Sequence, residues 1–329
     1  MTEDTHPYER LTPDMVMDCI ETVGFRCDAR IIPLNSYENR VYQVGVEDGE
    51  PVIGKFYRPN RWSDAQILEE HLFTLELEEL EIPVVPPLNL PNDSTLSEHQ
   101  GFRFAVYPRK GGRAPQIDDM ETLPILGRFI GRIHAVGQSS SFQHRPALTV
   151  SSFGHDSRNF LLENDFIPAE LLVAYETLTI GLLERIEEIF QQFSFLSNIR
   201  LHGDCHMGNV LWRDDIPHFV DFDDARSGLA VQDLWMLLSG EQDMQTMQIR
   251  KILEGYSDFC DFDPIELNLV EPLRSLRIMH HSGWLAKRWS DPAFPRAFPW
   301  FNSERYWAEH ILELREQMAA LYEPALSLY

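Results

Sequence analysis

The sequence predicts an α+β protein of two lobes, a small antiparallel β-sheet lobe followed by a larger and mainly helical lobe. Short β-branched and aromatic segments broken by turn residues dominate the first hundred residues. Helical periodicity dominates after residue 119, interrupted by one β-rich segment at 199–222. The segment 108–113 (PRKGGR) has the proline and adjacent glycines of a hinge. We therefore predict lobes at 1–107 and 114–329, with a ligand cleft between them.

Local patterns predict the elements in order. Thr12 caps a first helix that begins at Pro13 and stops at Gly24. A second helix begins at Ser63, which forms a capping box with Gln66. Strands are expected at 31–34, 41–46 and 52–57, a hairpin at 94–97 and 102–107, and helices at 63–80, 119–136, 168–195, 243–258, 264–288 and 303–322.

The composition excludes several classes of function. The 329 residues include 52 acidic and 28 basic side chains, a formal net charge of −24. Nucleic-acid binding and polybasic membrane binding both rely on clustered Lys and Arg, so we expect neither partner. No apolar stretch approaches the roughly 18 residues of a spanning helix, and the polar N-terminus does not resemble a signal peptide. The four scattered cysteines indicate reduced thiols, and we expect a cytoplasmic monomer.

The β-rich segment contains the clearest chemical pattern, RLHGDCHMGNVLW followed by HFVDFDDA. One interpretation is a zinc hydrolase, because His202, Asp204 and His206 alternate and alternate residues of an extended segment share a face. That interpretation lacks the further His or acidic ligands at fixed spacing. The other interpretation is phosphoryl transfer. Asn209 follows Asp204 by five residues and Asp221 follows the next apolar strand, which is the arrangement of the protein-kinase catalytic apparatus.

The kinase interpretation assigns a role to each of these residues. Asp204 would accept the proton of the attacking hydroxyl, and Asn209 and Asp221 would bind Mg²⁺, with Asp221 counted as catalytic as well. The first lobe must then supply a lysine for the phosphates of ATP, and Lys55 is the only lysine of the first hundred residues. A lysine among apolar neighbours needs a counter-charge, for which the next helix offers Glu69 and Glu70.

These motifs resemble those of kinase-like phosphotransferases of the aminoglycoside phosphotransferase and choline kinase superfamily, and within it a bacterial group of stress-response protein kinases. The resemblance covers almost the whole chain, including PLNSYENRVYQV, KFYRP, ILEEH, LHGDCHMGNVLWRD, AVQDLWMLL and RWSDPAFPRAFPW. It implies a bilobal protein-kinase-like fold, ATP and Mg²⁺ as cofactors, and serine/threonine protein kinase activity with a role in envelope or oxidative stress survival. A protein kinase of this kind is expected to label itself or a generic Ser/Thr protein. It favours Glu70 over Glu69 as the partner of Lys55. It also implies nucleotide contacts for Ser36, and we expect the adenine near Tyr107.

Three features depart from typical protein kinases. The loop LNSYENR lacks a G-x-G-x-x-G pattern, so we expect the Ser36 hydroxyl, local amides and Asn39 to hold phosphate. His206 stands where such kinases carry a lysine, and it either contacts the transferred phosphate or orders the loop. Only eleven residues separate Asp221 from Asp233, too few for a long activation segment. We expect Asp233, at the start of an apolar helix, to accept hydrogen bonds from the catalytic-loop backbone, and His202 to hold the same loop.

The acceptor stays open between two classes. The lack of a peptide-docking platform favours a small-molecule kinase of the aminoglycoside, choline or homoserine type, whereas the resemblance favours a protein, which we follow. A nucleotide-binding pseudokinase scaffold is a third alternative. We expect the aromatic-rich C-terminal segment to pack as a helix pair with a proline-rich connection. The alternative is that it walls the acceptor site, with Arg274, Arg277 or Trp284 touching substrate. We expect Asp223 and Asp224 to be solvated, the alternative being that either assists the metals. The concentration of acids around the triphosphate makes a divalent metal necessary, and the overall acidity would suit a cationic acceptor.

Overall fold

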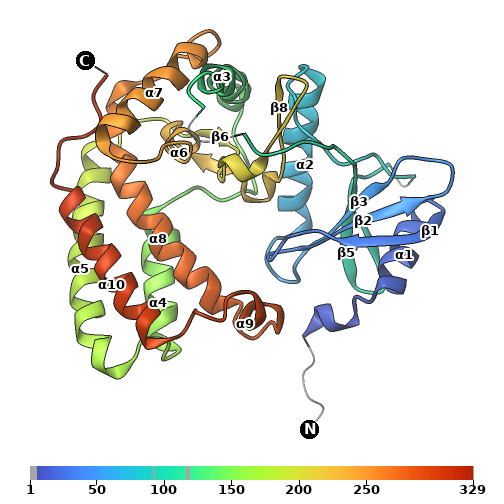
Figure 1. Ribbon diagram of the computed structural model, residues 1–329, viewed down its shortest axis with the longest axis horizontal. Coiled ribbons are helices and arrows are strands. Elements are labelled where there is room, and N and C mark those ends of the chain that lie inside the picture. Colours follow the sequence, from blue (N-terminus) through green and yellow to red (C-terminus); the bar gives the residue numbers. More distant parts are fainter. Residues whose placement is uncertain (1–5, 92, 116–118, 329) are drawn as a thin grey trace.

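The computed structural model describes residues 6–91, 93–115 and 119–328, and it confirms the predicted two-lobed α+β fold (Figure 1). The smaller lobe contains a five-stranded antiparallel sheet of order β1-β2-β3-β5-β4. Its strands are β1 (Cys27–Pro33), β2 (Arg40–Val46), β3 (Val52–Phe56), β4 (Ser97–His99) and β5 (Phe102–Pro108). The boundaries that we give the lobes and the hinge stay a prediction. The prediction that the N-terminus is not a signal peptide concerns a segment whose first five residues lie outside the described part of the chain.

Helices cover both faces of this sheet. On one face, Ile20 of α1 (Pro13–Thr22) belongs to the same apolar cluster as Phe56. On the other face, Ile67 of α2 (Asp64–Glu79) packs with Ala105. Because successive strand residues point to opposite faces, Lys55 lies on the α2 side of the sheet. Both predicted helix caps are present, Thr12 for α1 and the Ser63–Gln66 capping box for α2.

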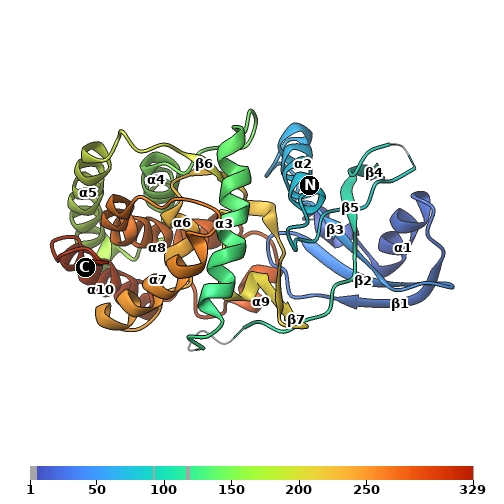
Figure 2. The same cartoon turned by 90° about the horizontal axis from the view of Figure 1, so that it is seen from above.

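Helix α2 connects the two lobes, since it lies between the sheet and the larger lobe (Figure 2). Its residues Phe73 and Leu77 are buried in the apolar core of the larger lobe, together with Leu123 and Leu126 of α3 (Leu123–Ser139). The first part of α2 therefore packs on the sheet, whereas its second part belongs to the core of the helical lobe.

The other helices of the larger lobe surround this core. They are α4 (Asp156–Glu163), α5 (Ala169–Gln192), α6 (Val231–Trp235), α7 (Gln242–Tyr256), α8 (Val270–Lys287), α9 (Ala293–Ala297) and α10 (Glu304–Ala320). The long predicted helices are confirmed, although the one expected at 264–288 starts with a 3₁₀ turn over Pro264–Leu269. Helices α4 and α9 were not predicted from the sequence. Asp233 lies inside α6 rather than at its start.

The predicted β-rich segment is confirmed and continues into one more strand. Strand β6 (Ile199–Leu201) pairs with β9 (Arg226–Gly228), and β7 (Val210–Arg213) pairs with β8 (Ile216–Phe219). Both pairs are antiparallel. They bring the loop after β6 and the loop after β8 side by side, and these two loops carry the predicted residues Asp204, Asn209 and Asp221.

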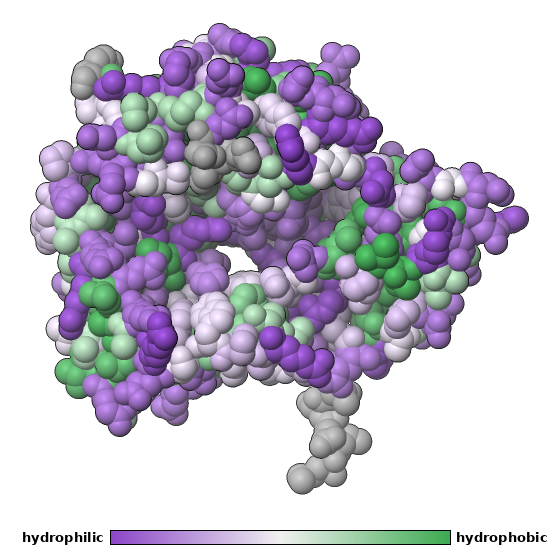
Figure 3. Space-filling view, viewed as in Figure 1, coloured by the Kyte–Doolittle hydropathy of each residue, from purple (hydrophilic) through white to green (hydrophobic). Residues whose placement is uncertain are grey.

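A second contact joins the lobes on the far side of the cleft. Asp291, just before α9, is buried and its carboxylate lies 2.8 Å from the guanidinium nitrogens of both Arg40 and Arg58 in the smaller lobe. Glu38 in the β1–β2 loop contacts Arg288 at the end of α8. We call these contacts the Asp291 bridge. Figure 3 shows an opening between the lobes, bordered largely by hydrophilic residues. Over the described residues, no helix has the length and apolar character needed to cross a membrane.

Candidate active site

Lys55 reaches across the cleft to the larger lobe. In the sheet it pairs with Ala105 of β5, and its Nζ lies 2.9 Å from Oδ1 of Asp221 and 3.3 Å from Oδ1 of Asp223. Burial by itself would lower the pKa of Lys55, but the two carboxylates hold it well above its usual value. The ammonium therefore stays charged. The structure thus brings together Lys55 and Asp221, which the sequence predicted from opposite lobes.

The two glutamates of α2 have different surroundings, and in the described structure neither forms an ion pair with Lys55. Glu70 is buried, and burial raises its pKa to about 7 although the nearby Lys55 charge acts in the opposite sense. Glu69 accepts hydrogen bonds from the backbone N–H groups of residues 143–145. Aspartates after β8 therefore supply the counter-charge that we expected from a glutamate. A contribution of Glu70 to nucleotide binding stays a prediction.

A buried charge cluster extends this contact, and it corrects our expectation that Asp223 and Asp224 are solvated. Asp223 is 4% exposed and contacts Arg61. Asp224 lies 2.8 Å from Arg61 and 2.6 Å from Arg226. Burial raises the pKa of Asp223, but the charges of Arg61 and Lys55 outweigh this effect and bring it down to about 2. Buried carboxylates need such partners, because an unpaired charge is costly away from water.

The sequence contained a signal for this cluster that we did not use. Three aspartates within the four residues 221–224 repel one another unless cations lie among them. The identity of those cations was not readable from local spacing, because Arg61 and Asp223 are 162 positions apart.

Asp233 and His202 fix the backbone around the predicted catalytic loop after β6, as expected from the sequence. The Asp233 carboxylate accepts the backbone N–H groups of His202 and Gly203, each at 2.9 Å. The His202 ring Nε2 lies 2.9 Å from the carbonyl oxygen of Val220. Gly203 has φ +85°, and a Cβ there would lie 2.2 Å from the carbonyl oxygen of Asp224. Only glycine fits this position, which explains the middle residue of the HGD motif.

The zinc interpretation is wrong for this fold. Within the described ranges, no group of three His, Cys, Asp or Glu residues converges as metal ligands. His202 is directed at a backbone carbonyl, and His206 accepts the Gly208 N–H through Nδ1 at 2.9 Å. His206 therefore orders the loop, and its Nε2 also lies 3.5 Å from Asp204.

The residues predicted to bind Mg²⁺ fit that ion when phosphate oxygens complete the coordination. Mg²⁺ is commonly held by one or two carboxylates plus substrate phosphates rather than by a full protein cage. The Asp221 side chain is 52% exposed, with the backbone in the left-handed region at φ +60°. The Asn209 amide nitrogen donates to the Asp204 backbone carbonyl at 2.9 Å, which leaves the amide oxygen for a cation.

Asp204 has the position expected of a proton acceptor at the cleft. Its Oδ2 lies 3.5 Å from both His206 Nε2 and Asn209 Nδ2. Its Oδ1 lies 2.6 Å from the guanidinium of Arg277 on α8. Burial raises the pKa of Asp204, but the hydrogen bond from His206 and the Arg277 charge lower it to about 2. At neutral pH Asp204 is therefore ionised and acts only as a hydrogen-bond acceptor.

Of the three residues singled out in the C-terminal segment, Arg274 and Trp284 pack against aromatic rings, whereas Arg277, over the described residues, does not. Arg274 lies against the Trp235 ring at 5.2 Å and pairs with Glu271, as a packing residue does. Trp284 packs on aromatic rings and also donates to Glu38 of the small lobe. Packing does not account for Arg277, which contacts the predicted proton acceptor, so the alternative of a residue at the acceptor site is favoured there.

The remaining predicted residues lie in the small lobe. Ser36 is partly buried in the β1–β2 loop. The neighbouring Asn39 is buried, and its amide oxygen accepts the Arg58 backbone N–H at 3.1 Å, so a structural bond occupies the group that we expected to face phosphate. Tyr107 lies on β5 with its hydroxyl 3.1 Å from that of Tyr57. The nucleotide contacts of Ser36 and Tyr107 stay predictions.

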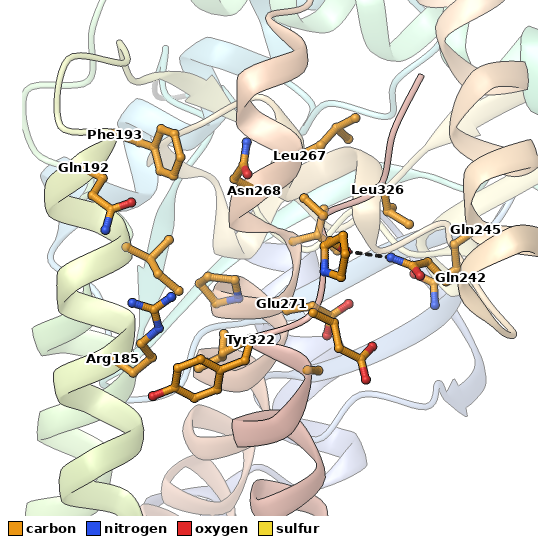
Figure 4. Close-up of a pocket in the computed structure, with 18 of the residues that line it drawn as sticks. Arg185, Gln192, Phe193, Gln242, Gln245, Leu267, Asn268, Glu271, Tyr322 and Leu326 are labelled. Atoms are coloured by element: carbon orange, nitrogen blue, oxygen red, sulfur yellow. Dashed lines mark hydrogen bonds between the residues drawn. The ribbon is translucent and has the colours of Figure 1, made fainter. Parts of the chain in front are cut away.

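A separate pocket of about 380 Å³ lies between α5, the start of α8 and the C-terminal segment (Figure 4). Its lining includes Arg185, Gln245, Glu271 and Tyr322. Arg185 lies over the Tyr322 ring at 4.9 Å. The residues that line this pocket include none of the predicted site residues, so it is not the predicted nucleotide site.

Comparison with known proteins agrees with this geometry. A model described as the phosphotransferase enzyme family matches residues 30–267. The chain belongs to the phosphotransferase enzyme family. The matched region of this phosphotransferase contains every predicted site residue from Ser36 to Asp221. The predicted enzyme class is thereby confirmed.

Relatives of this phosphotransferase are similar over its full length. Stress response kinase A of Escherichia coli is 44% identical over 329 residues, covering 100% of this chain and 99% of that protein. Serine/threonine protein kinase RdoA of Salmonella typhimurium is 42% identical over 328 residues, again with 100% and 99% coverage. The resemblance inferred from the motifs is confirmed.

Solved structures share the fold at lower identity. Amicoumacin kinase in complex with AMP-PNP and Ca²⁺ has a TM-score of 0.72 at 19% identity, covering 92% of this chain and 93% of that one. A microcompartment-associated aminopropanol kinase has a TM-score of 0.71 at 15% identity, covering 96% and 100%. These two structures confirm the kinase-like fold of the phosphotransferase.

Proposed function

We propose that this phosphotransferase is an ATP- and Mg²⁺-dependent serine/threonine protein kinase that acts in a stress response. One observation carries the proposal: Lys55 of the small lobe lies 2.9 Å from Asp221, and Asp204 and Asn209 occupy the adjacent loop. This arrangement supports the proposal, because phosphoryl transfer needs a cation for the phosphates, oxygens for the metal and a proton acceptor around one cleft. The names of the relatives that are 42–44% identical support the protein acceptor and the stress role.

Each residue would act through position and charge. Lys55 binds phosphate oxygens, and Asn209 and Asp221 hold the metal. The ionised Asp204 accepts a hydrogen bond from the acceptor hydroxyl and takes its proton as the hydroxyl oxygen bonds to the γ-phosphorus, while the bond from that phosphorus to the bridging oxygen breaks and ADP leaves. Mg²⁺ supplies the positive charge that allows a triphosphate to lie beside these carboxylates. Catalysis then rests mainly on orientation and charge neutralisation.

A small-molecule kinase is the second candidate. The named substrates of the structurally similar kinases favour it, since amicoumacin kinase and aminopropanol kinase act on small molecules by their names. Their identity to this chain is at most 19%, against 44% for stress response kinase A. We therefore place the protein acceptor first.

The test is transfer of labelled phosphate from ATP with Mg²⁺ by the full chain and by Asp204→Asn. Acceptors are the kinase itself, a generic Ser/Thr protein, an aminoalcohol and an aminoglycoside. We expect protein labelling by the wild type and a loss of about 10²–10⁴-fold in the variant, with nucleotide affinity retained. Asp215→Asn, on the exposed β7–β8 turn, is the matched control and should keep full activity. Unchanged transfer by Asp204→Asn would overturn the assignment, whereas Asp204-dependent transfer only to small alcohols would select the second candidate.

A further inference from the structure

We propose that Arg277 selects the acceptor by binding an anionic group beside the acceptor hydroxyl, so that the kinase prefers Ser/Thr segments flanked by acidic residues. This inference rests on the proposed function and names the substrate class of the same site. It reverses the expectation that an acidic chain suits a cationic acceptor.

Arg277 lies on the acceptor side of the cleft. Its guanidinium is 2.6 Å from Oδ1 of Asp204, the predicted proton acceptor, and its side chain is 39% exposed. It lies on α8, beyond the residues 30–267 that the family model matches. The contact therefore adds a cation to the family's predicted site residues, at the point where an acceptor hydroxyl must dock.

The sequence around Arg277 has a charge opposite to that of the whole chain. The segment 272–290 contains Arg274, Arg277, Lys287 and Arg288 and no Asp or Glu, in a protein of net charge −24. An acidic residue lies at each end of this segment. Glu271 pairs with Arg274, and Asp291 pairs with arginines of the small lobe. This part of the chain is therefore locally cationic, and a cation that it leaves accessible favours an anionic ligand.

The other cations of this segment are committed to structural contacts. Arg274 pairs with Glu271 at 3.2 Å, and Arg288 contacts Glu38 in the Asp291 bridge. Lys287 lies over the Phe160 ring at 5.6 Å. Among the described residues, the ion pair of Arg277 is with Asp204. Arg277 is therefore the cation of this segment that a substrate can engage.

The guanidinium group of Arg277 can contact both Asp204 and an anionic group of the acceptor. Arginine has five N–H donors in a planar fork, and a single carboxylate oxygen engages only part of it. When Asp204 turns to the acceptor hydroxyl, the exposed fork can take a carboxylate of the acceptor in a bidentate pair. A lysine at that place in the acceptor would instead face the Arg277 charge. Attraction between the Arg277 guanidinium and an acceptor carboxylate at ion-pair distance near the surface should raise the affinity for the acceptor by about tenfold or more.

The experiment compares three peptides that differ only in residues flanking one serine, which are Glu, Gln or Lys. The full chain is assayed with ATP and Mg²⁺ as wild type, Arg277→Gln and Arg277→Glu, and kcat/KM is measured for each peptide. Wild type should prefer the Glu peptide over the Lys peptide by about tenfold or more. Arg277→Gln should reduce this ratio to about twofold or less, and Arg277→Glu should invert it. Arg274→Gln, one turn earlier on α8, is the matched control and should retain the wild-type ratio.

The outcomes separate this inference from the proposed function. Equal use of the three peptides by wild type, preference for Lys, or an unchanged ratio in Arg277→Gln would each overturn the role of Arg277 and leave the kinase assignment intact. Asp204-dependent transfer to a small alcohol with no transfer to any peptide would overturn the protein acceptor, and this inference with it. If Arg277→Glu fails to fold by circular dichroism, the neutral Arg277→Gln variant decides the result.

Discussion

The two sides of the candidate site hold their charges in different ways. On the nucleotide side, the side chains of Lys55, Arg61 and Asp223 are 8%, 12% and 6% exposed, and they form a continuous network across the lobes. On the acceptor side, Asp204 and Arg277 are 24% and 39% exposed and form a single pair. A buried charge has to be neutralised by the protein in advance, whereas a partly exposed pair can exchange one partner for a ligand. We therefore expect the first network to stabilise the fold as well as to present Lys55, and we expect the second pair to be the one that a substrate can open.

The largest effect on stability should follow from Asp223→Asn. Removing this carboxylate leaves the buried Lys55 and Arg61 with less counter-charge, and breaking a buried pair typically costs about 3–5 kcal/mol in the free energy of unfolding. Urea unfolding followed by circular dichroism measures the change. Asp215→Asn, an exposed aspartate, is the control and should shift the free energy by less than about 0.5 kcal/mol. A loss below about 1 kcal/mol in Asp223→Asn would show that the network does not hold the fold together.

Glu70 should give the nucleotide side a pH-dependent stability. Burial raises its pKa to about 7 from the ordinary 4.5. The pKa of Glu70 is higher in the folded protein than in the unfolded chain, so protonation of Glu70 favours the folded state. This contribution to the free energy of unfolding is complete below pH 4.5 and is lost as the pH rises through 7. Glu70→Gln removes this loss. The variant should therefore gain up to about 3 kcal/mol relative to wild type between pH 4.5 and pH 8.

Urea unfolding at a series of pH values measures the Glu70 effect. Glu79→Gln, at the exposed end of the same helix, should show a constant difference from wild type and serves as the control. A constant difference for Glu70→Gln as well would mean that Glu70 is already ionised in the folded protein.

The smallest effect on stability should follow from Arg277→Gln. Exposed ion pairs contribute about 0–1 kcal/mol to stability, and salt screens them. The same unfolding assay should therefore show a loss of less than about 1 kcal/mol for this variant. A loss as large as that of Asp223→Asn would remove the distinction between the two sides and would make Arg277 a structural residue.

The sequence predicted the parts of the site that depend on short spacing. Asp204 and Asn209 are five residues apart in one loop, and a short strand pair returns Asp221 beside them, so a local pattern was sufficient. The partners Arg61 and Arg277 come from distant elements. No local pattern indicated Arg61, and the sequence raised Arg277 as a candidate without indicating its contact with Asp204. Their contacts depend on how the two lobes and α8 dock, which is a property of the tertiary packing.

Local patterns also set the limits of the fold prediction. Long helices show several turns of apolar periodicity, whereas α9 has only five residues and cannot show a period. Glu69 and Glu70 illustrate a similar limit, since adjacent helix residues point about 100° apart. Which of the two faces the cleft depends on the rotation of α2 against its neighbours.

The Asp291 bridge closes the two lobes into a ring, because they also meet at Lys55 and Asp221. A closed ring restricts which acceptors can reach the site. A flexible chain end can reach into the opening while the ring stays closed, whereas an acceptor too wide for the opening enters only if the bridge comes apart. Because Asp291 is buried, salt screens its ion pairs only weakly, and Asp291→Asn is the change that weakens the bridge. This variant should change access for folded acceptors more than for free tails.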